Sequence, residues 1–156
     1  MEKTNAMRIL DQNKIEYKSY YYGDTDAISG IDVASVLGQD FRQVFKTLVT
    51  VSLSKKYYVF MLPVDKELDL KKASKAVGEK SISMLPSKEL LKITGYIHGG
   101  CSPIGIKKQF PVVVDESARQ FNTIIFSAGK IGYQVEVSVI DLEEKLHYSF
   151  TTIVKE

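Results

Sequence analysis

Two short segments, well separated along the chain, contain residue types that could do chemistry. The first, Val44-Phe45-Lys46-Thr47-Leu48, places one lysine inside an apolar run. The second is a glycine-rich loop that runs from Gly95 to Gly105 and includes one proline. A cation held partly out of water and a loop of exposed backbone N–H groups are what a pocket for an anionic or carbonyl-bearing substrate needs.

Lys46 lies among apolar neighbours, so its ammonium must find a partner or reach water. In a strand, Lys46 would share one face with Val44 and Leu48, and Thr47 would lie on the other face. The residues leave two interpretations open. Lys46 is either an edge lysine with a solvated tip or a cation at the rim of a pocket, beside the hydroxyl of Thr47.

The glycine-rich loop also has two interpretations. Its glycines permit backbone conformations that are closed to other residues and let a ligand approach the main chain, and Pro103 stiffens the turn. Convergent N–H groups of Gly99, Gly100, Cys101 and Ser102 would hold a carbonyl oxygen or the oxyanion formed from it. The alternative is a tight structural turn. The spacing matches no Walker or Rossmann phosphate loop.

The run from Ser127 to Gln134 is a third place where chemistry is possible. The hydroxyl of Ser127 and the small residues Ala128 and Gly129 stand between two predicted strands. They either border a cleft or form a plain hairpin turn. We include Ser127, Ala128, Gly129 and Gln134 among the expected substrate-binding residues.

The chain has one cysteine, Cys101, which excludes an internal disulfide and argues against a structural zinc site. A thiol nucleophile needs an aligned base, and the nearness of His98 in the sequence does not supply one. The acidic residues show no metal-ligand spacing with a histidine. We therefore expect no metal, no cofactor and no catalytic part for the thiol of Cys101.

The 156 residues include 21 basic and 19 acidic side chains, a net charge of +2 that neither demands nor excludes a nucleic-acid partner. The first residues lack the apolar core of a signal peptide. The longest apolar stretch, residues 57–64, is far too short to span a bilayer. We expect one domain over residues 1–156, in the reducing cytoplasm and without membrane contact.

The hydrophobic pattern alternates short helices with strands. Helices are predicted over residues 4–10, 31–37, 69–77, 86–91 and 140–146. Strands are predicted over residues 14–22, 44–53, 57–64, 81–85, 111–115, 122–126, 133–139 and 147–154. Because regular βαβ spacing is missing, we expect an α/β (α+β) fold: a mixed, curved, mostly antiparallel sheet of about seven strands, with short helices packed outside.

Taken together and in their order along the chain, the sequence motifs resemble those of the YbaK/EbsC family of Cys-tRNA(Pro) deacylases, within the wider group of bacterial prolyl-tRNA synthetase editing domains. The resemblance covers nearly the whole chain. It rests on the opening Thr4-Asn5-Ala6, the region of Tyr20, and the runs 44–48, 99–105, 127–132 and 135–137.

The resemblance implies the mixed-sheet fold of that family and the hydrolysis of cysteine mischarged on proline tRNA. Lys46 matches the family's invariant lysine at the editing pocket. The loop from Gly99 to Pro103 matches its glycine-x-x-x-proline loop, which binds near the terminal adenosine. Tyr20, Thr47 and Ser127 stand where the family places pocket-lining groups. Gln134 replaces an aspartate of some relatives, and Ile28 an aromatic residue.

The resemblance also implies that the thiol of the substrate's own cysteine attacks its carbonyl, displaces the ribose oxygen and releases the amino acid as a cyclic thioester. Proximity alone is worth roughly 7–11 kcal/mol in such a reaction at best. The protein then has to bend the ester, stabilise the oxyanion through Gly99 to Ser102, and assist departure of the ribose oxygen. We expect Lys46 to anchor the terminal phosphate or the ribose.

The expected partners are the acceptor end of tRNA(Pro) and prolyl-tRNA synthetase, in a ternary complex that supplies RNA selectivity. Six lysines could form a basic rim for phosphates, or they are simply solvated charges. They are Lys71, Lys72 and Lys75 on one predicted helix, with Lys107, Lys108 and Lys130. Two alternatives stay open. One is an Ala-tRNA(Pro) editing enzyme of the same fold. A pocket that selects by size distinguishes side chains that differ by one methylene by only about 1–3 kcal/mol, so alanine could also be accepted. The other is a non-catalytic module that binds the acceptor end or a synthetase.

Overall fold

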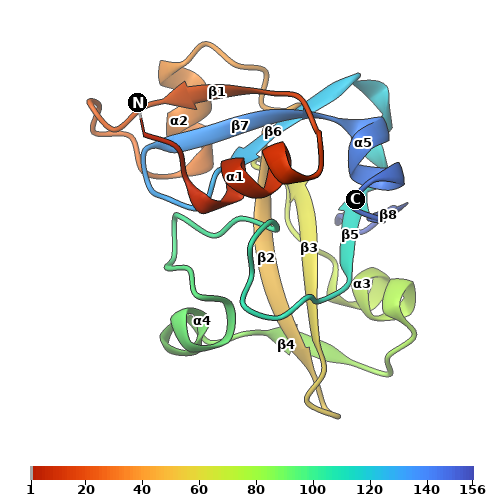
Figure 1. The fold of residues 1–156 in the computed structure, drawn as a ribbon. Helices are drawn as coiled ribbons and strands as arrows, with labels where there is room; N and C mark the ends of the chain where they lie inside the picture. The colour runs from red at the N-terminus through yellow and green to blue at the C-terminus, as the bar shows by residue number, and fades with distance from the viewer. Residues whose placement is uncertain (1) are drawn as a thin grey trace.

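The computed structural model describes residues 2–156 and has two sheets flanked by short helices (Figure 1). The strands are β1 (Tyr17–Tyr21), β2 (Phe45–Ser52), β3 (Tyr57–Pro63), β4 (Ile82–Met84), β5 (Val112–Asp115), β6 (Thr123–Ser127), β7 (Tyr133–Ser138) and β8 (Ser149–Thr151). The helices are α1 (Asn5–Gln12), α2 (Gly30–Val36), α3 (Leu70–Val77), α4 (Ser87–Thr94) and α5 (Val139–Glu144), with a 3-10 turn at Glu116–Gln120.

The predicted α/β class with mostly antiparallel pairing is confirmed, because four of the six strand pairs are antiparallel. The strands are divided between two sheets, however, in the orders β1-β7-β6 and β4-β2-β3-β5-β8. The sheets meet where Val44 and Ile125 form an isolated parallel bridge. Side chains of both sheets, among them Phe45, Val59 and Val135, belong to one core cluster.

The helix ends follow the sequence signals. Thr4 caps α1 by accepting a hydrogen bond from the N–H of Met7 at 3.2 Å. Asp69 caps α3 through the N–H groups of Lys71 and Lys72, and Gly78, with a φ of 74°, ends that helix. These caps fix where each helix meets the sheets.

Strand β2 has an incomplete outer edge. Strand β3 pairs with β2 along its length, from Phe45 to Val51. On the other edge, β4 pairs only with residues from Thr50 to Ser52, and the bridge to β6 lies at Val44. The middle of β2 therefore has no strand neighbour on this edge among residues 2–156.

Candidate active site

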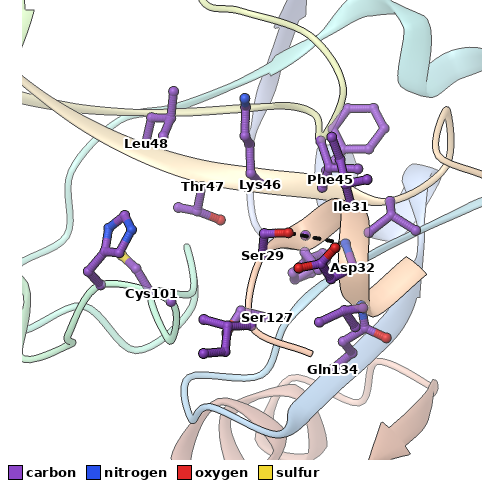
Figure 2. A pocket seen from close by; sticks show the side chains of 18 of the residues that line it. Ser29, Ile31, Asp32, Phe45, Lys46, Thr47, Leu48, Cys101, Ser127 and Gln134 are labelled. Atoms are coloured by element: carbon purple, nitrogen blue, oxygen red, sulfur yellow. Dashed lines mark hydrogen bonds between the residues drawn. The ribbon is translucent and has the colours of Figure 1, made fainter. Parts of the chain in front are cut away.

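A cavity of about 550 Å³ opens at the incomplete edge of β2 (Figure 2). Its walls come from β2, from the segment that enters α2, from the glycine-rich loop after α4, and from the ends of β6 and β7 that face each other. The predicted residues that line it are Lys46, Thr47, Gly99, Cys101, Ser127 and Gln134. Three segments that are far apart in the sequence thus meet at one cavity.

Lys46 is half-buried and has an unusual environment for a lysine. Figure 2 shows Lys46 and Leu48 on one face of β2 and Thr47 on the other. Burial lowers the pKa of Lys46, and the negative charges of Glu67 and Asp65 act in the opposite direction. Within residues 2–156 its ammonium forms no ion pair. The charge is therefore available to an anionic ligand at the rim of the cavity.

The hydroxyl of Thr47 is buried and has no hydrogen-bond partner among the described residues. An unpaired buried hydroxyl costs free energy, so a ligand group that hydrogen-bonds to it is favoured. Since Thr47 lines the cavity, this hydroxyl is a contact point for a polar part of a substrate.

The glycine-rich loop divides into residues at the cavity and residues that hold the loop. The N–H of Gly100 donates to the carbonyl of Ile97 at 3.0 Å, so the turn already uses it. Ser102 is fully buried, and its Oγ accepts from the N–H of Ile104 at 3.2 Å. Pro103 is buried as well. His98, Gly99 and Cys101 are the residues of this loop that line the cavity.

Cys101 and His98 both line the cavity, but the thiol is not activated. Burial raises the pKa of Cys101 to about 12, with a weaker opposite effect from a hydrogen bond with Thr94. The thiol is therefore protonated at neutral pH, whereas the thiolate is the nucleophilic form. Attack by the substrate's own thiol stays a prediction.

Tyr20, Gln134 and Ser127 lie in register across β1, β7 and β6. Gln134 and Ser127 line the cavity, and the Oε1 of Gln134 accepts a hydrogen bond from Gln39 at 2.9 Å. Tyr20 is not part of the lining: its hydroxyl donates to Glu136, and this hydrogen bond raises the pKa of Tyr20 to about 12. Tyr20 supports the sheet beside the cavity.

Ala128 and Gly129 shape the turn between β6 and β7. The N–H of Ala128 donates to the carbonyl of Tyr133 at 3.0 Å, and the N–H of Gly129 donates to the Oγ of Ser127 at 3.1 Å. Gly129 has a φ of 91° and lies against the ring of Tyr96. Ser127 borders the cavity, as the cleft interpretation requires. Ala128 and Gly129 form the hairpin turn and, contrary to their predicted substrate-binding role, are not among the lining residues.

Sequence reasoning missed one whole wall of the cavity. Tyr22, Leu90, Phe126 and the residues 28–33 at the entrance to α2 all contribute to the lining. Ile28 and Ile31 are 68% and 43% exposed. Two exposed isoleucines around the N-terminal cap of a short helix are the signal that could have indicated this wall.

Within residues 2–156, His, Cys, Asp and Glu side chains are nowhere grouped in threes that could hold a metal ion. None of the helices in that range is long and apolar enough to cross a membrane.

The chain belongs to the family of aminoacyl-tRNA editing domains, whose family model matches residues 26–145. A protein of Enterococcus faecalis (strain ATCC 700802 / V583), provisionally named Cys-tRNA(Pro)/Cys-tRNA(Cys) deacylase EbsC, is 49% identical over 138 residues. That alignment covers 88% of this chain and 84% of the Enterococcus protein.

The chain is also similar to part of a proline–tRNA ligase of Shouchella clausii (strain KSM-K16). The two are 30% identical over 102 residues, which are 65% of this chain and 18% of the ligase.

Solved structures share the fold. One, described provisionally as a trans-editing enzyme for prolyl tRNA synthetase, superimposes with a TM-score of 0.83 at 20% identity over the full length of both chains. Another, described as hypothetical protein APE2540, gives a TM-score of 0.87 at 18% identity over 95% of this chain and 97% of the other.

Proposed function

We propose that this protein deacylates mischarged Cys-tRNA(Pro), with the substrate's own thiol as the nucleophile. The observation that carries the proposal is a single cavity that joins a half-buried lysine, a buried hydroxyl and a protonated thiol. Among residues 2–156, the lysine has no ion-pair partner and the hydroxyl has no hydrogen-bond partner. Such a site can hold and orient an ester but contains no activated cysteine of its own. The name of the Enterococcus relative supports the same substrate.

The geometry suggests a role for each part of the cavity. Lys46 lies at the rim, on the face of β2 opposite to Thr47, so we assign it to the terminal phosphate or ribose. Thr47, Ser127 and Gln134 offer hydrogen bonds to the aminoacyl end. The walls of Ile28, Leu90 and Phe126 are apolar and restrict the size of the side chain that enters.

The proposal is tested with three charged forms of one RNA: Cys-tRNA(Pro), Ala-tRNA(Pro) and Pro-tRNA(Pro). We expect fast ester loss from the cysteinyl form and slow loss from the other two. Faster loss from the alanyl form would instead assign the protein to alanine editing. Binding of the charged RNA without any ester loss would make it a non-catalytic module.

We also propose that prolyl-tRNA synthetase supplies RNA selectivity in a ternary complex. The similarity to the Shouchella proline–tRNA ligase, in which the matched segment is part of the synthetase itself, supports this partnership. The protein alone should then deacylate Cys-tRNA(Pro) and Cys-tRNA(Cys) at similar rates. Added prolyl-tRNA synthetase should raise the rate on Cys-tRNA(Pro) selectively, and equal rates in its presence would contradict the ternary complex.

A further inference from the structure

The backbone hydrogen bonds of β2 alternate between its two edges, and this alternation determines which backbone groups face the cavity. The carbonyl of Val44 accepts from the N–H of Val64 at 2.9 Å, and the N–H of Ser52 donates to the carbonyl of Lys56 at 2.9 Å. In an antiparallel ladder every second residue bonds to the same neighbour. Even-numbered residues of β2 therefore bond to β3, and odd-numbered residues point their N–H and C=O groups to the outer edge.

The outer edge is occupied at both ends and open in the middle. Ile125 of β6 donates its N–H to the carbonyl of Gln43 at 3.0 Å, and its bridge partner is Val44. At the other end, Leu85 donates its N–H to the carbonyl of Val49 at 3.0 Å, just before the pairing with β4 begins. Thr47 lies between these two ends, and its N–H and C=O have no strand partner among residues 2–156.

The open stretch coincides with the cavity. Thr47 lines the cavity, and so do Phe126 and Ser127 at the end of β6 and Leu90 on α4. The buried hydroxyl of the same residue also has no hydrogen-bond partner in the part of the chain that the structure describes. Two independent observations, one on the main chain and one on the side chain, thus mark Thr47 as the place where a ligand completes the structure.

We propose that the aminoacyl group of the substrate pairs with Thr47 as a one-residue strand in this gap. This inference rests on the proposed deacylase function. The N–H of Thr47 donates to the carbonyl oxygen of the ester, and the C=O of Thr47 accepts from the α-ammonium group. These are the two hydrogen bonds that opposed residues exchange in an antiparallel pair. The N–H of Thr47 is therefore an oxyanion donor in addition to the glycine-rich loop.

The pairing also places the substrate's side chain. Directly opposed residues of an antiparallel pair project their side chains on the same face. An L-aminoacyl group paired with Thr47 would therefore lie with its side chain beside the Thr47 hydroxyl, on the face of β2 away from Lys46. Lys46 then remains free for the RNA end of the same ligand. The pairing thus explains how the site would recognise the free α-amino group and the L configuration of an aminoacyl ester.

The test compares two variants that share a valine side chain at position 47 and differ by one N–H group. Thr47→α-hydroxyvaline, made by nonsense suppression, replaces the amide with an ester, and Thr47→Val is its matched control because it keeps the N–H. We expect the ester variant to deacylate Cys-tRNA(Pro) about 100- to 1,000-fold more slowly than Thr47→Val, the loss typical of one oxyanion donor. Rates within threefold of each other would overturn the proposal.

A second ester variant controls for effects on stability. Val51→α-hydroxyvaline removes an N–H that faces β4, since Val51 pairs with Ser83. It should lower the thermal unfolding midpoint more than the Thr47 ester does, and it should leave kcat within about twofold of the unmodified protein. Loss of kcat in this variant as large as in the Thr47 ester would mean that strand disruption, and not the missing donor, slows the reaction.

The substrate side of the pairing has its own test. The 3-mercaptopropionyl ester of tRNA(Pro) keeps the thiol and lacks the α-amino group. We expect its ester loss to be about 10- to 100-fold slower than that of Cys-tRNA(Pro), because a hydrogen bond from a charged donor is missing. Equal rates on the two esters would overturn the proposal, whereas no activity on Cys-tRNA(Pro) itself would overturn the deacylase function.

A binding measurement distinguishes failure of the Thr47 pairing from failure of the proposed deacylase function. The affinity of the cysteinyl amide of 3′-amino-3′-deoxyadenosine, which cannot be hydrolysed as an ester, is measured by calorimetry for Thr47→Val and Thr47→α-hydroxyvaline. We expect the dissociation constant to be about 10-fold or more higher for the ester variant. Equal affinities would reject the pairing whether or not the protein is a deacylase.

Discussion

The ammonium of Lys46 is partly removed from water, and an anionic ligand would compensate for this loss of solvation. Lys46 is half-buried, burial lowers its pKa, and it forms no ion pair within residues 2–156. Lys46→Ala should therefore lower kcat/KM on Cys-tRNA(Pro) by about 10- to 100-fold, through the lost contact to phosphate or ribose. Its thermal unfolding midpoint should be unchanged or higher, because a desolvated charge is removed.

Lys66, an exposed lysine in the loop after β3, provides the control for Lys46. Lys66 follows β3 and does not line the cavity, so Lys66→Ala should keep full activity. Both variants are compared by single-turnover deacylation and by thermal melts. Activity in Lys46→Ala equal to that of Lys66→Ala would remove Lys46 from the site.

The pH–rate profile and the Cys101→Ala variant together test whether the nucleophile is the thiol of Cys101 or that of the substrate. Because its pKa is about 12, Cys101 should add no inflection to the pH–rate profile between about pH 6 and 9. The rate of the native enzyme should instead rise with the ionisation of the substrate thiol, whose ordinary pKa is about 8.5. Cys101→Ala should show the same pH–rate profile with rates within about threefold. A dead Cys101→Ala variant with a normal melting temperature would restore an enzyme-thiol mechanism.

At the scale of elements, the β6–β7 turn and the glycine-rich loop support each other. The ring of Tyr96 contacts Gly129, and its hydroxyl donates to the carbonyl of Ile104. A Cβ at Gly100 would lie 3.2 Å from the backbone nitrogen of Ile131. Close packing between the two loops therefore holds Ser127 and Gly99 at the same cavity.

Gly129→Ala should disturb this packing, and Gly38→Ala is its matched control. Both glycines have a positive φ, 91° and 66°, so both substitutions have the left-handed backbone cost of about 1–2 kcal/mol. A Cβ at Gly129 would also lie 2.9 Å from Tyr96, whereas nothing lies within 4 Å at Gly38. We expect Gly129→Ala to lower the free energy of unfolding by about 1–3 kcal/mol more than Gly38→Ala.

Urea unfolding measures that difference, and deacylation assays show its effect on the site. Gly129→Ala should also slow the reaction, because the N–H of Gly129 donates to the Oγ of Ser127. Equal unfolding free energies for the two variants would show that the loops are not packed as closely as the structure has them.

Local signals in the sequence predicted most elements of this fold. The caps Thr4 and Asp69 and the terminating Gly78 lie at the ends of the helices predicted over residues 4–10 and 69–77, because capping depends on neighbouring residues alone. The division into two sheets was not predictable in the same way. Strand β5 pairs in parallel with both β3 and β8, and such pairings join residues with no local relation in the sequence.

The candidate site could likewise be predicted only where it depends on local sequence signals. The alternation of β2 correctly placed Lys46 and Thr47 on opposite faces. It did not show that both line one cavity, since this depends on where β4 and β6 stop along the edge of β2. The wall from α2 depends on how that helix packs against Val44, Val64 and Ile125, which share a core cluster with Ala34. No periodicity in residues 28–33 reports this packing.

At the scale of the whole molecule, the expected basic residues do not form one rim. Lys71 and Lys75 are on α3, which Figure 1 shows across β2 and β3 from α4. Lys107 lies beside Gly95 at the end of α4, near the glycine-rich loop. Lys130 is ion-paired with Glu2. A tRNA end that enters the cavity therefore meets the lysines after α4 more readily than those of α3.

This arrangement predicts unequal effects of two lysine pairs with the same total charge. Lys107→Ala/Lys108→Ala should weaken binding of uncharged tRNA(Pro) about 10-fold, because phosphate contacts dominate affinity for nucleic acid. It should also reduce the slope of log affinity against log salt by about one for each lysine. Lys71→Ala/Lys75→Ala removes the same charge from α3 and should change neither quantity beyond the general effect of net charge. Filter binding over a range of salt concentrations measures both. A larger loss in the α3 pair would mean that the RNA approaches over that helix, and the aminoacyl end would then have to reach the edge of β2 from the opposite side of the sheet.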